Sequence, residues 1–133
     1  MADELLVLYD RDCGFCAWAL AWLLRWDYGR RLRPVAIQSE QGQRCLAALE
    51  PQARLASWHA VDRRGAVLSG SAALPSLLER LPAGAPLARL AAAVPALSAR
   101  SYGWIAAHRT LLSRPIPARS KRRARELIAR RML

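Results

Sequence analysis

Two cysteines separated by two residues are the strongest chemical signal in the chain. Residues 13–16 read Cys-Gly-Phe-Cys; they follow the apolar run at residues 5–9 and open a stretch of helix-forming residues. Residues three apart on a helix share a side, with Cβ atoms roughly 5–6 Å apart, whereas a disulfide needs roughly 3.5–4.5 Å. The adjustable first turn of a helix can close that gap. The spacing therefore predicts a disulfide between Cys13 and Cys16 that can form and be released.

The start of a helix also predicts different roles for the two thiols. Unpaired N–H groups and the positive end of the helix dipole stabilise a thiolate there. Cys13 lies nearest to that end, so we expect it to attack a substrate disulfide, and Cys16 to resolve the mixed disulfide. Phe15 is expected to exclude water on one side, and Gly14 to let the backbone of a partner approach closely.

Charged residues directly precede the cysteines. Carboxylates at Asp10 and Asp12 would raise the pKa of a nearby thiol unless Arg11 offsets them. Two interpretations stay open for the carboxylates. In the first, Asp10 accepts a proton from Cys16 during resolution; in the second, Asp10 and Asp12 only cap the helix.

The elements that must position the dithiol alternate between strands and helices. Apolar runs bounded by turn residues predict strands, and periodic stretches predict helices. The predicted order is β-α-β-α-β-β-α, with strands at residues 5–9, 32–37, 57–61 and 66–69 and helices at 14–26, at 41–50 and up to about residue 81. Pro34 makes the second strand less secure or places it at an edge. The alternation predicts an α/β domain of two layers.

The length of 133 residues fits one domain. We expect residues 1–82 to form the redox core and residues 83–133 to form a helical C-terminal extension with a basic tail. The same compact domain is expected to continue to about residue 114.

The net charge of +11 is concentrated in the second half of the chain. Residues 1–68 contain nine basic and eight acidic residues, whereas residues 69–133 contain twelve basic and two acidic residues. This asymmetry predicts a weak contact of the tail with polyanions, or more simply a solvated basic helix. A nucleic-acid-binding module has no other support, because no RNA motif with interleaved aromatic residues accompanies the tail.

The chain shows no sign of export or membrane insertion. The first residues are acidic where a signal peptide would be basic, and the longest apolar run, residues 15–24, is too short to cross a bilayer. We therefore expect a cytoplasmic protein. In a reducing compartment a close cysteine pair is more often catalytic or metal-binding than structural.

Trp18, Trp22 and Trp26 are spaced four apart on the first predicted helix. Such a stripe is more typical of a buried face than of a cofactor site. This helix is apolar on nearly every side, so either the C-terminal helices or a partner must cover it. The second alternative predicts a homodimer through the Trp-rich helix.

Beyond the spacing, the segment Leu8 to Cys16 resembles the cysteine box of the DCC family of predicted thiol-disulfide oxidoreductases. Further matches to this family are Asp27, residues 32–38, Asp62 with Gly65, residues 70–73 and the box from Tyr102 to Arg109. The family usually has glycine at position 11 and commonly asparagine at position 108, where this chain has Arg11 and His108.

The resemblance covers roughly residues 5 to 114. It implies a thioredoxin-like fold and protein-disulfide reductase activity, with Cys13 and Cys16 as the redox pair. Its substrates would be disulfide-bearing proteins or small thiols, with an external reductant and no bound cofactor. Thioredoxins place a cis-proline before the third strand, and the nearest candidate here is Pro51.

Two other chemistries are alternatives to a redox dithiol. Cys13, Cys16, Cys45 and His59 offer four ligands for a structural zinc ion, although the last two lack ligand-pair spacing. Asp10-x-Asp12 after an apolar strand also resembles the nucleophile motif of haloacid-dehalogenase-type phosphatases. That class needs a suitably placed lysine and a later acidic group, but the only lysine is Lys121 in the tail, so we exclude it.

Overall fold

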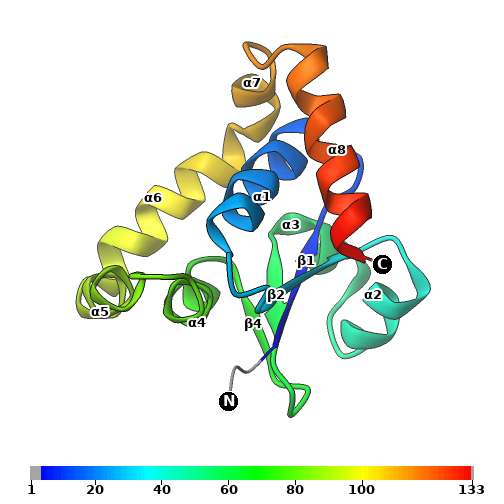
Figure 1. Ribbon diagram of the computed structural model, residues 1–133. Coiled ribbons are helices and arrows are strands. Elements are labelled where there is room, and N and C mark those ends of the chain that lie inside the picture. The colour runs from blue at the N-terminus through cyan, green and yellow to red at the C-terminus, as the bar shows by residue number, and fades with distance from the viewer. Residues whose placement is uncertain (1–3, 133) are drawn as a thin grey trace.

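One mixed sheet of four strands forms the centre of the computed structural model, which describes residues 4–132 (Figure 1). The order is β2-β1-β3-β4, with β1 at Leu5–Tyr9, β2 at Leu32–Ala36, β3 at His59–Val61 and β4 at Val67–Ser69. Strands β1 and β2 are parallel, whereas β3 is antiparallel to both β1 and β4. The predicted α/β class is confirmed, and the arrangement is consistent with a thioredoxin-like fold.

Helices make up most of the remaining chain. They are α1 (Gly14–Trp26), α2 (Glu40–Cys45), α3 (Pro51–Ala56), the 3-10 helix η1 (Gly70–Ala73), α4 (Leu74–Glu79), α5 (Ala85–Ala93), α6 (Pro95–Ala107), α7 (Arg109–Ser113) and α8 (Ala118–Met132). The predicted helix at residues 41–50 ends earlier, at Cys45, and Pro51 starts a separate helix because proline is favoured at the first helical position. Among residues 4–132, no helix is both long and apolar enough to cross a membrane.

The alternation of side chains along β1 divides the core into two clusters. Leu5, Val7 and Tyr9 face α1 and pack in the larger cluster with residues of α1, α4 and α8. Leu8 points to the other face and packs with Val35, Ile37, Leu46 and Val61. The sheet is therefore covered on both faces, and the larger cluster holds α1 in place.

Pro34 lies in β2, which is an edge strand, as the sequence allowed. The N–H of Ile37 bonds to the carbonyl of Tyr9, at 2.9 Å. The backbone N–H groups of a strand alternate in direction, so an N–H at position 34 would point away from β1. The pairing with β1 therefore needs no donor at this position. The proline therefore costs the β1–β2 ladder no hydrogen bond.

Helix α8 packs against α1 and β2. Ala124 and Ile128, one turn apart, are both 1% exposed. The sequence predicted most simply a solvated basic helix here; most basic residues of α8 are exposed, but one face of the helix is buried. In Figure 1, α8 lies beside α1, and α7 lies near the start of α1. The C-terminal helices thus cover α1, which is one of the two alternatives that the sequence left open.

A buried ion pair joins the last turn of α8 to the end of α1. Nη2 of Arg131 lies 2.6 Å from Oδ2 of Asp27, and Nη1 of Arg131 donates to the carbonyl of Leu24 at 2.9 Å. The carboxylate of Asp27 also accepts the N–H groups of Arg31 and Leu32, at 3.0 and 2.9 Å. The side chains of Arg131 and Asp27 are only 9% and 0% exposed, so this pair connects α1, α8 and the start of β2 inside the protein.

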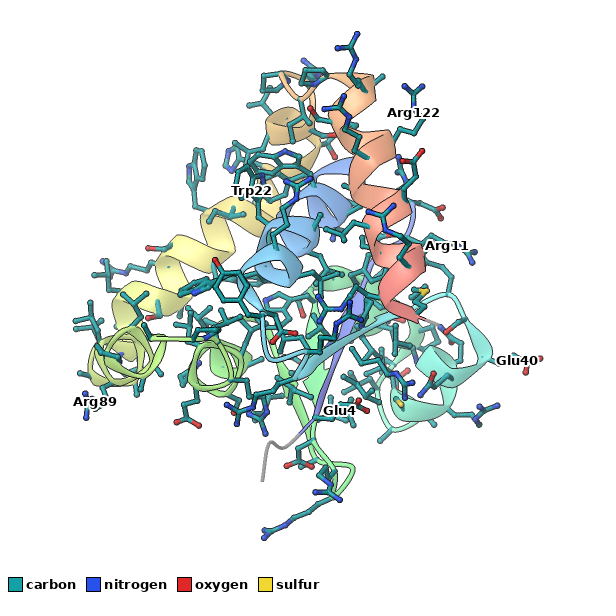
Figure 2. The ribbon with its side chains drawn as sticks, viewed as in Figure 1. Glu4, Arg11, Trp22, Glu40, Arg89 and Arg122 are labelled. Atoms are coloured by element: carbon teal, nitrogen blue, oxygen red, sulfur yellow. The ribbon has the colours of Figure 1, made fainter. Side chains whose placement is uncertain are left out.

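The tryptophan stripe is not the buried face of α1. The buried residues of this helix are Ala17, Leu20, Ala21 and Leu24. Trp22, by contrast, is 54% exposed (Figure 2), and the guanidinium of Arg25 lies over its ring. The interpretation of Trp22 as a core residue is wrong. The homodimer through this helix and the contact of the tail with polyanions stay predictions.

Candidate active site around Cys13 and Cys16

The two cysteines lie where β1 passes into α1. A turn after Tyr9 is closed by the N–H of Cys13, which donates to the carbonyl of Asp10 at 3.1 Å. Cys13 is the N-cap residue of α1, and its Sγ accepts the N–H of Cys16 at 3.3 Å. Both are half-buried free thiols. An N–H that has no partner within the helix therefore points at the sulfur of Cys13, the predicted nucleophile.

The Asp10 carboxylate holds the turn rather than capping α1. Its Oδ1 accepts the N–H of Asp12 at 3.0 Å and an N–H of the Gln38 amide at 2.7 Å. The same amide accepts the N–H of Arg11 through its oxygen, at 3.0 Å. Gln38, which follows β2, thus fixes the turn from the neighbouring strand. The sequence offered no signal for this role, although Gln38 lies in a segment that matches the family.

Arg109 at the start of α7 supplies the positive charge next to the dithiol. Its Nη1 donates to Sγ of Cys16 at 3.8 Å, and its Nη2 donates to the carbonyl of Leu55 at 2.9 Å. Nη2 also lies 3.7 Å from Oδ2 of Asp10. The sequence placed Arg109 in the family box but assigned it no role. The segment from Tyr102 to Arg109 therefore has a physical role, because it places a guanidinium next to the thiols.

The geometry separates the acidities of the two thiols. The hydrogen bond from the Cys16 thiol is the largest cause that lowers the pKa of Cys13 to about 6; the N–H of Cys16 and the charge of Arg109 act in the same direction. Burial and the charge of Asp10 partly oppose this shift. The pKa of Cys16 is raised, first by its hydrogen bond to Cys13, then by burial and by the negative charge of Cys13. Cys13 is therefore the thiolate at neutral pH, and Cys16 the thiol.

This acidity predicts the pH dependence of alkylation at Cys13. The thiolate is the reactive form, so its rate of reaction with iodoacetamide is expected to rise with pH through a midpoint near 6. An unperturbed cysteine has a midpoint near 8.5, about two units higher. Arg109→Leu is expected to move the midpoint upward, because it removes a cation that lowers the pKa. Mass spectrometry of Cys13 after timed labelling measures the rates.

The matched control is Arg122→Leu, which removes an exposed cation from α8. This variant is expected to keep the midpoint of the unmodified protein. A midpoint above about 8 for Cys13 in the unmodified protein would contradict the assignment of the thiolate.

Tyr102 on α6 forms a hydrogen bond with the backbone just before β3. Its hydroxyl accepts the N–H of Trp58 at 3.1 Å, and its ring lies against Gly70. Gly70 has a φ of +59°, and a Cβ there would lie 3.1 Å from the ring. No peptide bond within residues 4–132 is cis. Pro51, the nearest candidate for a cis-proline, instead starts α3.

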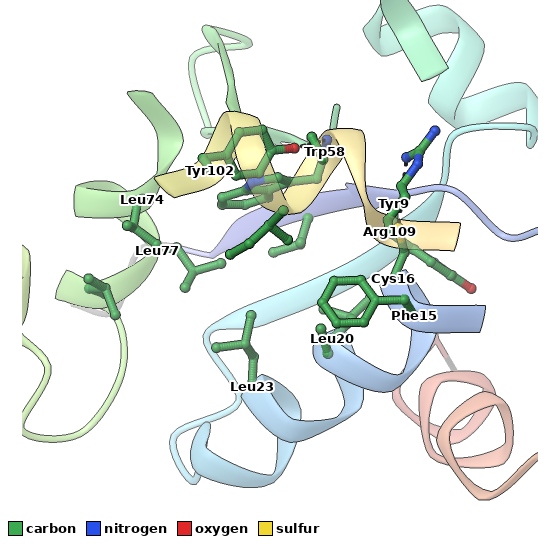
Figure 3. Close-up of a pocket in the computed structure, with 15 residues that line it drawn as sticks. Tyr9, Phe15, Cys16, Leu20, Leu23, Trp58, Leu74, Leu77, Tyr102 and Arg109 are labelled. Atoms are coloured by element: carbon green, nitrogen blue, oxygen red, sulfur yellow. Dashed lines mark hydrogen bonds between the residues drawn. The ribbon is translucent and has the colours of Figure 1, made fainter. Parts of the chain in front are cut away.

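Two cavities of similar size flank the dithiol. An apolar cavity of about 280 Å³ lies on the side of Cys16, between α1, α4 and α6 (Figure 3). Leu20, Leu77 and Trp58 contribute to its walls. A polar cavity of about 300 Å³ lies on the side of Cys13, between the turn after β1, α7 and α8. The side chain of Arg109 lines both cavities.

The three predicted substrate-approach residues have different surroundings. Phe15 lines the apolar cavity, in keeping with a role in excluding water. Gly14 does not face open space, because a Cβ there would lie 2.9 Å from Cδ of Lys121. Arg11 is exposed (Figure 2). It lines a separate hollow with residues of β2 and α2. The side chains of Lys121 and Ser113 therefore cover Gly14 in this structure, and its role in the approach of a partner backbone stays a prediction. Arg109 rather than Arg11 provides the cation at the thiols.

The four proposed zinc ligands do not form one site. Both ring nitrogens of His59 are already in hydrogen bonds, with Ser69 Oγ at 2.7 Å and with the carbonyl of Arg54 at 2.9 Å. Cys45 packs against the cluster on the other face of the sheet. In the part of the chain that the structure describes, no three His, Cys, Asp or Glu side chains are grouped to hold a metal ion.

Comparison with known families finds a match to the DCC1-like thiol-disulfide oxidoreductase family over residues 7–115. This range includes most of β1, both thiols, Gln38, Tyr102 and Arg109, but not α8. No curated protein and no solved structure matches the chain. Because the match spans most of the sequence, this chain belongs to the DCC1-like thiol-disulfide oxidoreductase family.

Proposed function

We propose that the protein reduces disulfides, with Cys13 as the attacking thiol and Cys16 as the resolving thiol. The position of Cys13 Sγ at the N-cap of α1, where it accepts the N–H of Cys16, carries this proposal. The hydrogen bond between the two thiol groups stabilises a thiolate on Cys13 and leaves the proton on Cys16, and the N–H of Cys16 adds to the stabilisation of that thiolate. Membership of the family supports disulfide-bearing substrates in general terms.

The reaction has two exchange steps. In the first, the Cys13 thiolate attacks one sulfur of the substrate, the substrate S–S bond breaks, and a thiolate leaves. In the second, Cys16 loses its proton and attacks Sγ of Cys13, which releases the other half of the substrate as a thiolate. The substrate gains two electrons, and the protein is left with a Cys13–Cys16 disulfide, which an external thiol reductant resets.

The mixed disulfide itself lowers the barrier to the second step. Once Cys13 is bonded to the substrate, it no longer carries the negative charge and the hydrogen bond that raise the pKa of Cys16. Nη1 of Arg109, 3.8 Å from Cys16 Sγ, then stabilises the new thiolate. Asp10, engaged by Gln38 and near Arg109, acts as a positioning residue for the turn in this proposal.

A redox titration of the full chain tests this function. The protein is equilibrated in buffers with a graded ratio of oxidised to reduced dithiothreitol, the free thiols are alkylated, and the products are identified by mass spectrometry. We expect one reversible two-electron transition that involves Cys13 and Cys16, while Cys45 stays alkylated throughout. A pair that never oxidises across the series, or that pairs with Cys45, would contradict the proposal.

A further inference from the structure

The C-terminal helices cover the backbone surfaces at which an extended peptide would meet the dithiol. A Cβ at Gly14 would lie 2.9 and 3.0 Å from Cδ and Cε of Lys121 and 3.0 Å from Oγ of Ser113. On the other side, the N–H of Trp58 already donates to the hydroxyl of Tyr102. A peptide strand would have to displace these contacts before it could pair with either surface.

The polar cavity beside Cys13 provides a different route to the nucleophile. Its volume of about 300 Å³ is at the lower end of the range of small-molecule sites, roughly 300–1,000 Å³. Cys13 lines this cavity, whereas Cys16 lines the apolar one. A disulfide that enters the polar cavity therefore meets the attacking sulfur, and the resolving sulfur lies behind it.

The charges around this cavity fit a zwitterionic molecule. Lys121 and Arg114 line the cavity, and within residues 4–132 neither side chain forms an ion pair. Asp12 also lines the cavity, and in the same range its carboxylate forms no ion pair. Asp10 and Arg109, by contrast, face each other at 3.7 Å. Two cations and one carboxylate are thus available to a ligand with carboxylates and an ammonium group.

We propose that the substrate is a low-molecular-weight disulfide with free amino-acid ends, of the kind represented by glutathione disulfide. Its carboxylates bind Lys121 and Arg114, its ammonium group faces Asp12, and its disulfide lies against Cys13. This inference rests on the proposed function and names the substrate class of the same site.

The reaction of this substrate balances with the groups at hand. Attack of the Cys13 thiolate forms a bond between Cys13 and one half of the substrate and releases the other half as a thiolate. Cys16 then displaces the bound half, and a proton from Cys16 accounts for one of the two product thiols at neutral pH. The dithiol is oxidised by two electrons, and the substrate is reduced by two.

A single-turnover comparison of four disulfides tests the substrate class. The full chain is reduced, freed of reductant, and mixed with glutathione disulfide, neutral 2-hydroxyethyl disulfide, cationic cystamine or a disulfide-cyclised neutral hexapeptide. Acid quenching, alkylation and mass spectrometry follow the oxidation of Cys13 and Cys16. We expect glutathione disulfide to react fastest, by about tenfold over the neutral disulfide, the factor expected for one charge-assisted hydrogen bond. Cystamine and the hexapeptide are expected to react most slowly.

Lys121→Gln separates the charge of the cavity from the chemistry of the thiols. Glutamine keeps much of the side chain that covers Gly14 but removes the cation, so the rate with glutathione disulfide is expected to fall about tenfold. The rate with 2-hydroxyethyl disulfide, which has no charge to pair with Lys121, is expected to fall much less than the rate with glutathione disulfide. The matched control is Arg122→Gln, the exposed neighbour on α8 (Figure 2), which is expected to change neither rate.

The possible failures are distinct. If the hexapeptide reacts as fast as glutathione disulfide, or if Lys121→Gln lowers both rates equally, the substrate class is wrong and disulfide reduction stands. If none of the four compounds oxidises the reduced pair, the proposed function itself is wrong.

Discussion

Replacing Cys13 with serine is expected to abolish disulfide reduction, and replacing Cys16 is expected to stop the reaction halfway. A serine hydroxyl is not deprotonated near neutral pH, and loss of the nucleophile in comparable enzymes costs more than about a thousandfold in rate. Cys16→Ser keeps the attacking thiolate but removes the group that resolves the mixed disulfide. Mixing this variant with glutathione disulfide is therefore expected to leave glutathione bound to Cys13, as measured by intact mass and peptide mapping.

Cys45→Ser serves as the control for this pair. Cys45 packs on the other face of the sheet from α1, so its loss is expected to leave the rate of disulfide reduction unchanged. Circular dichroism establishes that each variant is folded. If the Cys13→Ser protein still formed a disulfide in single turnover, another group would be the nucleophile. If the Cys16→Ser protein turned over normally, Cys16 would not be the resolving thiol.

The second large effect concerns stability and depends on the ion pair between Arg131 and Asp27. Arg131→Leu leaves the fully buried carboxylate of Asp27 without its guanidinium partner. Breaking a buried pair from one side typically costs about 3–5 kcal/mol in the free energy of unfolding, because the remaining charge is not compensated. Urea denaturation followed by tryptophan fluorescence is expected to show a midpoint at lower urea and an extrapolated free energy of unfolding that is lower by this amount.

A double variant distinguishes the buried charge from the lost packing of α8. In Arg131→Leu combined with Asp27→Asn, the neutral amide no longer requires a cation, so part of the lost stability is expected to return. Arg130→Leu, at an exposed neighbouring position, is expected to change the free energy of unfolding by no more than about 0.5 kcal/mol. Equal destabilisation by Arg131→Leu and Arg130→Leu would show that the ion pair contributes nothing to stability.

Local sequence patterns located the dithiol because its geometry is local. The apolar run of β1, the turn after Tyr9 and the helix formers of α1 are contiguous, so the position of Cys13 at a strand-to-helix junction follows from residues within a few positions of it. The same holds for Pro34, whose missing N–H requires an edge or outward position in a sheet.

The residues that contact the dithiol lie too far from it in the sequence for local patterns to predict these contacts. Arg109 is 93 residues from Cys16, and its contact depends on how α6 and α7 pack against α1. Periodicity cannot indicate that the first residue of a short helix reaches a sulfur so far away in the sequence. Only the resemblance to the family pointed to the box from Tyr102 to Arg109, and it supplied no contact for either residue.

The misreading of the tryptophans has a physical cause in helix packing. Alanines at positions 17, 21 and 124 are buried in α1 and α8, and small residues let two helices approach closely. The larger indole of Trp22 is displaced to the outside of the same helix. A hydrophobic stripe therefore identified α1 as a helix correctly but not which of its faces is buried.

The proline in β2 also has a consequence for how the protein behaves at high concentration. An unpaired strand at the edge of a sheet invites the addition of a strand from another molecule, which is a route to aggregation. At β2, Pro34 offers no outward N–H, its side chain is fully buried, and α8 packs over the strand. The opposite edge, β4, has only three residues. Neither edge is a good template for intermolecular β-pairing, so we expect clustering of this protein to involve helices rather than cross-β growth.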